Sequence, residues 1–142
     1  CVVGNNVIMT NNAVIGGHVR LGDGVIIGGN AAVHQFCRIG RKAMIGGLSG
    51  VDRDVIPFGI VTGDRGKLCG LNVIGLKRSG YDEGVVKSIT KAFMFIFKGK
   101  EGTFEDRLAQ AHEKFKDNEM VMEQVKFIDE ALQGRRKIMV AE

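Results

Sequence analysis

Apolar residues recur at every sixth position through residues 1–54, which divide into nine consecutive blocks of six. The first position of each block is small or β-branched, and the fourth is Gly in six of the nine blocks. A period of six is not that of an α-helix. The third position is apolar without exception: Val3, Met9, Ile15, Leu21, Ile27, Val33, Ile39, Ile45 and Val51.

This period predicts a parallel β-solenoid. Short strands would alternate with tight corners of Gly, Asn and Asp, residues that tolerate turn conformations. Three blocks would complete one triangular coil, so residues 18 apart would stack at about 4.8 Å, the spacing of neighbouring strands. The register loosens at Pro57, so we expect coils over residues 1–62 and a Gly-rich connector over 63–81.

The pattern changes to that of helices from about Asp82. Apolar residues at spacings of three and four predict a helix with Asp82 as its N-cap and Gly99 near its end. Residues 82–142 are therefore expected to form a C-terminal α-helical domain that covers the end of the solenoid. The residues that carry this first helical pattern are Val85, Val86, Ile89, Phe93, Ile96 and Phe97.

Two further helices are predicted in the same region. One follows Thr103, where Thr-Phe-Glu-Asp resembles a capping box with Asp in the last position. The other runs from about Asn118 and is closed by Gly134. The expected apolar face of the helix after Thr103 comprises Leu108, Ala109, Ala111 and Phe115.

The repeat begins in full register at Cys1, without an initiator Met or a polar capping element. A solenoid needs a cap over its open strand edge. We therefore expect further coils upstream of this chain. The longest apolar run, residues 92–97, is too short to span a bilayer, and no basic leader precedes it, so a soluble cytoplasmic protein is predicted.

Charge and cysteine content narrow the function only slightly. The net charge is +4, with basic residues gathered at 38–42, 77–78 and 135–137, which indicates an anionic partner. Nucleic acid is disfavoured, because one Tyr and no Trp are available for stacking and no nucleic-acid motif is present. Three cysteines without CxxC spacing predict neither a disulfide framework nor a zinc site. Two of them, Cys1 and Cys37, fall in the inward register.

His34 is the clearest departure from the repeat, because it takes a fourth position usually held by Gly. Its block stacks over the block that contains His18, so both histidines are expected on one face, about one coil apart. A lone histidine at such a corner is more often an ordinary polar surface residue, but two on one face favour a functional site. Metal binding needs at least three convergent ligands, so no metal site is predicted.

Two further features suggest ligand contacts. Gly29 and Gly47 stack above Asn11 in the fifth position; turn geometry alone would explain them, but they would also leave a shallow groove for an alkyl chain. In the connector, the amide of Asn72 offers hydrogen bonds, and Lys77 with Arg78 offers charge for a phosphate or diphosphate. An irregular loop with solvated charges is the alternative.

Taken together, these strings resemble the acyl-ACP:UDP-N-acetylglucosamine O-acyltransferase family over essentially the whole chain. The matching strings are residues 17–19, 32–36, 46–50 and 72–78. The resemblance implies an all-β left-handed parallel β-helix (a hexapeptide solenoid) followed by the helical domain. It also implies a homotrimer whose active sites lie in clefts between neighbouring solenoids.

In that family a histidine acts as general base on the 3-hydroxyl of UDP-N-acetylglucosamine, which attacks the thioester of a 3-hydroxyacyl chain on acyl carrier protein. This is the first step of lipid A biosynthesis, and it implies no cofactor beyond the acyl-ACP co-substrate. The resemblance assigns an oxyanion-hole N–H to Gly17 and a supporting role to His18. The residues that it assigns to substrate binding are His34, Gln35, Gly29, Gly47, Asn72 and Arg78.

Within that set, Asn72 and Arg78 match residues that hold the nucleotide, and a bulky residue in place of Gly47 would shorten the accepted acyl chain. Two departures stand out. Ser79 replaces a second Arg, which weakens the expected phosphate contact, and the family's general base lies just upstream of Cys1. This chain alone is thus expected to be inactive. An N-acyltransferase for a 3-amino sugar nucleotide and a trimerising scaffold remain alternatives.

Overall fold

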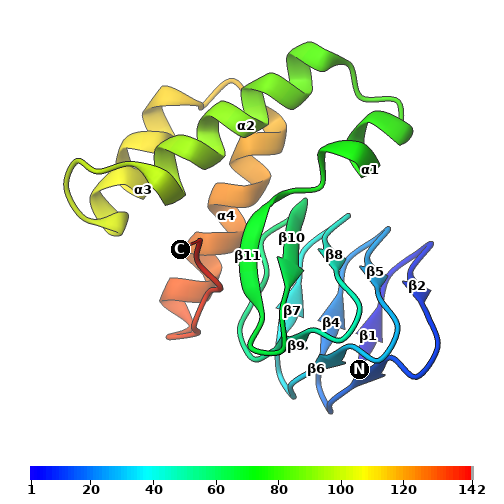
Figure 1. Cartoon of the computed structure of the whole chain (residues 1–142). Coiled ribbons are helices and arrows are strands. Elements are labelled where there is room, and N and C mark those ends of the chain that lie inside the picture. The colour runs from blue at the N-terminus through cyan, green and yellow to red at the C-terminus, as the bar shows by residue number, and fades with distance from the viewer. Residues whose placement is uncertain (142) are drawn as a thin grey trace.

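The computed structural model describes residues 1–141 and begins with a three-coil parallel β-solenoid (Figure 1). Parallel pairing joins residues 18 apart, as in Val3 with Leu21 and Leu21 with Ile39, which confirms the predicted coil length. The three faces of the prism are β1 (Val2–Val3), β4 (Arg20–Leu21) and β7 (Arg38–Ile39); β2 (Ile8–Met9), β5 (Ile26–Ile27) and β8 (Met44–Ile45); and β3 (Val14–Ile15), β6 (Ala32–Val33) and β9 (Gly50–Val51).

The third-position residues form the interior of the solenoid from the second coil onward. Leu21, Ile27 and Val33 are buried, whereas Val3 and Met9 of the first coil are exposed at the open end. The same difference separates the two cysteines of the inward register, because Cys37 is buried and Cys1 is exposed. Burial raises the pKa of the Cys37 thiol to about 11, so this thiol stays protonated at neutral pH.

The corners turn through a left-handed backbone conformation at the sixth position of the first eight blocks. His18, Phe36 and Leu48 adopt it with φ of 59°, 67° and 60°, although this region disfavours bulky side chains. Hydrogen bonds between coils hold these corners: the N–H of Leu48 donates to the Gly29 carbonyl at 2.9 Å. Gly at the fourth position allows the backbones of successive coils to approach each other closely. A Cβ on Gly28, for example, would lie 2.4 Å from the backbone nitrogen of Gly47 in the next coil.

The solenoid ends in a hairpin. Strand β10 (Gly59–Thr62) pairs in parallel with β8, and β11 (Lys67–Leu71) returns antiparallel to β10. The short helix α1 (Val73–Arg78) follows, with Asn72 as its N-cap. The connector therefore contains a paired strand and one and a half turns of helix, where the sequence suggested only a Gly-rich segment.

The three predicted helix starts are confirmed in α2 (Glu83–Lys98), α3 (Phe104–Lys114) and α4 (Glu119–Gln133). The side chains of Asp82, Thr103 and Asn118 each accept the N–H of the residue three positions later. The capping box at Thr103 is complete. The predicted burial of Ala109 is wrong: it is exposed, because one residue beyond the buried Leu108 the helix has turned by about 100°.

The helices gather at the end of the solenoid that carries β10 and β11, away from the N-terminal coil (Figure 1). Buried side chains of α2, α3 and α4 join those of the coils in one hydrophobic core. Gln124 of α4 is buried at this junction and donates from Nε2 to the Pro57 carbonyl at 2.9 Å. The helical region is thus anchored to the last coil by both apolar and polar contacts.

Replacing Ser49 by Ala is expected to raise the free energy of unfolding by about 1 kcal/mol. Ser49 is 2% exposed, and its hydroxyl has no hydrogen-bond partner within residues 1–141. Its stacking partners one and two coils earlier are Ala31 and Ala13, so Ala fits this position. Urea unfolding of the two proteins measures the difference; a loss of stability on substitution would mean that the hydroxyl has a partner in solution.

Candidate active site

The predicted site residues lie at three different corners of the prism. We define the histidine corner as residues 16–18, 34–36 and 52–54, between the β3 and β4 faces. The glycine corner comprises residues 10–12, 28–30 and 46–48, and the connector corner comprises 4–6, 22–24 and 40–42. One chain therefore does not bring all of these residues into a single cleft.

Both histidines lie at the histidine corner in successive coils, but they do not stack on each other. The ring above His18 is that of Phe36, with centroids 4.8 Å apart and planes inclined by only 3°. His34 lies two residues before Phe36 and lines a different cavity. His18 borders a cavity of about 340 Å³ shared with Cys1, Arg20 and Arg136, and His34 borders one of about 740 Å³ beside the β10–β11 hairpin.

The imidazole of His34 is oriented by the backbone of the next residue, Gln35. Its Nδ1 lies 3.2 Å from the carbonyl oxygen of Gln35. A carbonyl can only accept, so Nδ1 carries the proton of this hydrogen bond, and Nε2 of the neutral ring is left as an acceptor. His34 can thus accept a proton or a hydrogen bond from a ligand in the larger cavity.

Gly17 lies beside His18 and has an open donor. Its N–H has no hydrogen-bond partner within the described chain, and a Cβ on Gly17 would meet no atom within 4 Å. The backbone on either side of this N–H is held between coils: the Gly17 carbonyl accepts the N–H of Phe36 at 2.9 Å, and the N–H of Gly16 donates to the Val33 carbonyl at 2.8 Å. An unpaired N–H whose flanking backbone is held, at a residue with open space beside its α-carbon, suits an anionic oxygen.

The glycine corner has two stacked positions without a side chain. Gly47 stacks on Gly29, and a Cβ on Gly47 would come within 3.3 Å of the Gly29 carbonyl oxygen. Leu48, next to Gly47, is 72% exposed and adds an apolar side chain to this edge. This edge therefore has two positions without side chains beside an exposed apolar side chain, which is compatible with contact to an alkyl chain.

The connector corner places the nucleotide-loop residues. The Asn72 side chain is engaged within the chain: Oδ1 accepts the Gly75 N–H at 3.0 Å, and Nδ2 donates to the Lys42 carbonyl at 3.3 Å. Asn72 therefore attaches α1 to this corner, and its amide is not free for a ligand here. Arg78 ends the helix, is exposed, and makes no polar contact with another described residue.

Lys42, which belongs to the basic group at residues 38–42, reaches the residue that follows Arg78. Its Nζ donates to the hydroxyl of Ser79 at 2.9 Å. Ser79 is the position at which the family pattern has a second Arg. The ammonium group of Lys42 thus lies next to Ser79, where the missing second Arg suggested a loss of positive charge. Because the two residues are 37 apart in the sequence, only their contact in the structure shows this.

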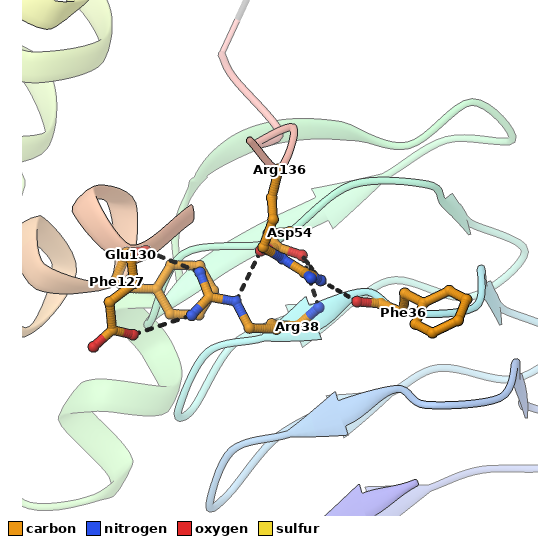
Figure 2. Close-up of polar contacts among 6 residues, drawn as sticks. All are labelled: Phe36, Arg38, Asp54, Phe127, Glu130 and Arg136. Carbon is orange, nitrogen blue, oxygen red and sulfur yellow. Dashed lines mark hydrogen bonds and ion pairs between the residues drawn. The ribbon is translucent and has the colours of Figure 1, made fainter. Parts of the chain in front are cut away.

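A buried ion cluster is centred on Asp54, in the third coil of the histidine corner (Figure 2). Asp54 is 2% exposed and binds Nε of Arg38 at 2.9 Å and Nε of Arg136 at 2.7 Å. Burial by itself would raise the pKa of Asp54, but the hydrogen bonds from Arg136 and Arg38 outweigh it and lower the pKa. Arg136 also donates to the carbonyl of Phe36.

Two features are absent from the described residues. No group of three or more His, Cys, Asp or Glu side chains within residues 1–141 could hold a metal ion. None of the helices in the same range has the length and apolar character needed to cross a membrane.

The known proteins that are similar to this chain carry the name of one family. Residues 54–139 match the family model of UDP N-acetylglucosamine O-acyltransferase, domain 2. Two curated proteins named acyl-(acyl-carrier-protein)–UDP-N-acetylglucosamine O-acyltransferase align over 90% of this chain: the Caulobacter vibrioides protein is 52% identical and the Rhizobium etli protein 46% identical. The alignments cover 48% and 47% of those proteins, so this chain spans about half the length of the curated relatives that it matches.

Solved structures give the same relationship. The Arabidopsis UDP-N-acetylglucosamine acyltransferase superposes with a TM-score of 0.94 at 34% identity, over 99% of this chain and 50% of that one. The Campylobacter jejuni UDP-N-acetylglucosamine acyltransferase superposes with a TM-score of 0.88 at 32% identity, over 100% of this chain and 53% of that one. The coil repeat, the hairpin and the helices are thus shared, and the chain belongs to the UDP-N-acetylglucosamine O-acyltransferase family.

Proposed function

We propose that the protein is an acyltransferase that moves a 3-hydroxyacyl chain from acyl carrier protein to the 3-hydroxyl of UDP-N-acetylglucosamine, the first step of lipid A biosynthesis. The relatives' names state an acyl group on acyl carrier protein as donor and UDP-N-acetylglucosamine as acceptor. The observation that carries the proposal is the histidine corner, where the unpaired N–H of Gly17 lies beside His18, and His34 presents an oriented imidazole in the next coil.

In this mechanism the sugar oxygen attacks the thioester carbon, its proton passes to a general base, and the carrier thiol leaves. The Gly17 N–H would donate to the carbonyl oxygen as negative charge develops on it. His18 and Nε2 of His34 would orient the sugar, with Gln35 beside them. The general base is expected just upstream of Cys1, as in the family pattern, so residues 1–142 alone are expected not to turn over.

We further propose that the enzyme is a left-handed, cytoplasmic homotrimer with no cofactor other than acyl-ACP. The separation of the candidate residues onto three corners supports the trimer. Gly29 and Gly47, proposed for the acyl chain, lie at a different corner from His18, and Arg78, proposed for the nucleotide, lies at the third. A cleft between two neighbouring solenoids would unite a corner of one chain with a different corner of the next.

An assay of the full-length protein with 3-hydroxyacyl-ACP tests the function. Formation of an O-acyl product from UDP-N-acetylglucosamine is the expected result. Turnover only with a 3-amino sugar nucleotide would instead identify an N-acyltransferase. No turnover with either acceptor, together with no calorimetric binding of the UDP-sugar, would leave the scaffold alternative.

Replacing Lys42 by Ala is expected to raise KM for UDP-N-acetylglucosamine roughly tenfold, the size of one charge-assisted hydrogen bond. The reason is the position of its ammonium group at Ser79, beside the unpaired Arg78. Steady-state kinetics at saturating acyl-ACP measure the change. Lys91→Ala is the matched control, because Lys91 is an exposed lysine on α2, outside the connector corner; an equal rise in both variants would contradict a specific role for Lys42.

A further inference from the structure

The histidine corner ends differently from the other two corners. His18, Phe36 and Asp54 occupy the same position in three successive coils. The N–H of Phe36 donates to the carbonyl of Gly17, one coil earlier, in the regular pattern. The N–H of Asp54 leaves this pattern and donates to the carbonyl of Lys137 at 3.0 Å.

The C-terminal tail therefore takes part in this corner. Asp54 forms an isolated parallel bridge with Ile138, and its carbonyl accepts the N–H of Met139 at 2.8 Å. Arg136, which precedes this bridge, extends back toward the second coil (Figure 2). A segment 82 residues away from Asp54 in the sequence thus contacts the wall of the candidate site.

Arg136 makes a fixed connection between Asp54 and Phe36. Its Nε lies 2.7 Å from Oδ2 of Asp54, and its Nη2 lies 3.0 Å from Oδ1 and also donates to the Phe36 carbonyl (Figure 2). On the opposite side, Asp54 accepts hydrogen bonds at 2.9 Å from the backbone N–H and from Nε of Arg38. A planar guanidinium held by a buried carboxylate in this bidentate way has little freedom to move.

Phe36 passes this restraint on to His18. Phe36 has a φ of 67°, a conformation that costs about 1–2 kcal/mol for a residue with a Cβ and needs support from its surroundings. Its backbone is held on both sides, by the Gly17 carbonyl at N–H and by Arg136 at the carbonyl. Its ring lies parallel to the imidazole of His18 at 4.8 Å, and both His18 and Arg136 line the cavity of about 340 Å³.

We propose that Arg136 is a positioning residue, which holds the imidazole of His18 in its productive orientation through the Phe36 carbonyl and the ring stacked on His18. Its importance for the reaction rests on the proposed acyltransferase function. Its effect on the orientation of His18 does not. The C-terminal tail would in this way support a site that is built two coils away.

The orientation is tested by NMR of the histidine rings. In Arg136→Ala the ring protons of His18 are expected to shift downfield, because they lose part of the ring-current shielding from Phe36. His34 and His112 provide internal references, since neither stacks on an aromatic ring in the described structure. Arg135→Ala is the matched control: Arg135 is adjacent and exposed, and its side chain has no partner within residues 1–141.

Arg136→Lys separates orientation from stability if the Ala variant folds poorly. A Lys can keep one ion pair with Asp54, but its single ammonium cannot span both carboxylate oxygens and the Phe36 carbonyl in the fork geometry of Arg. We expect this variant to fold, to shift the His18 resonances, and to lower kcat roughly tenfold to a hundredfold with little change in KM. Unchanged His18 resonances in both variants would overturn the proposal. A wild-type protein without acyl transfer would refute the proposed function while leaving the NMR result to decide the orientation.

Discussion

Replacing Asp54 by Ala is expected to lower the free energy of unfolding by about 3–5 kcal/mol, because it leaves two partly buried arginines without their shared carboxylate. Asp54 is 2% exposed and lies 2.9 Å from Arg38 and 2.7 Å from Arg136. The same change removes the anchor of the C-terminal tail. Denaturant unfolding, followed by circular dichroism, measures the loss.

Asp52→Ala is the matched control for this experiment. Asp52 lies two residues earlier and is largely exposed, and its nearest cation is the exposed Arg53 at 3.6 Å. An exposed pair of this kind contributes less than about 1 kcal/mol. Equal losses for Asp52→Ala and Asp54→Ala would show that the buried cluster contributes nothing beyond surface charge.

The contribution of Asp54 also predicts a pH dependence. Burial, the largest influence, acts to raise the pKa of this carboxyl, but Arg136 and Arg38 together hold the pKa below its ordinary value of 3.8. A carboxyl with a lowered folded-state pKa stabilises the fold above the unfolded-state value, and this stabilisation is lost as the pH falls through the folded-state pKa. The stability difference between wild type and Asp54→Asn is therefore expected to be full at neutral pH and to shrink below about pH 4.

Replacing His18 by Ala is expected to lower kcat on the order of a hundredfold, the effect of losing a group that orients the reacting sugar. His18 is stacked on Phe36 and adjoins the unpaired N–H of Gly17, so its removal also opens the wall of the cavity. Initial rates of product formation by the full-length protein provide the measurement.

His112→Ala is the control for His18, because His112 lies on α3 and contacts Asp129 at 2.7 Å, at a distance from the solenoid corners. Its kcat is expected to equal that of wild type. If His18→Ala retained the wild-type kcat as well, the histidine corner would not be the place where the sugar is oriented.

Local rules made much of the fold predictable. A hexad brings together strand and corner preferences within six residues, so the period followed from the third-position pattern, and the known three-sided geometry of hexapeptide solenoids then gave the coil length. Helix caps are equally local, and Asp82, Thr103 and Asn118 were identifiable because each side chain bonds a backbone N–H only three residues away. Ala109 was misplaced because its apolar character says nothing about which side of the helix faces a neighbour.

The amino-acid sequence by itself determined the solenoid period, the helix starts and the residue types of the candidate site, since each depends on contacts within a few residues. The same 18-residue register places Phe36, and not His34, over His18. Only the tertiary structure decided that the amide of Asn72 is engaged by the Lys42 carbonyl and that Arg136 reaches Asp54. These partners are 30 and 82 residues apart. A side chain's choice among several distant partners depends on how the coils, hairpin and tail pack, and no pattern within a short stretch of chain encodes that packing.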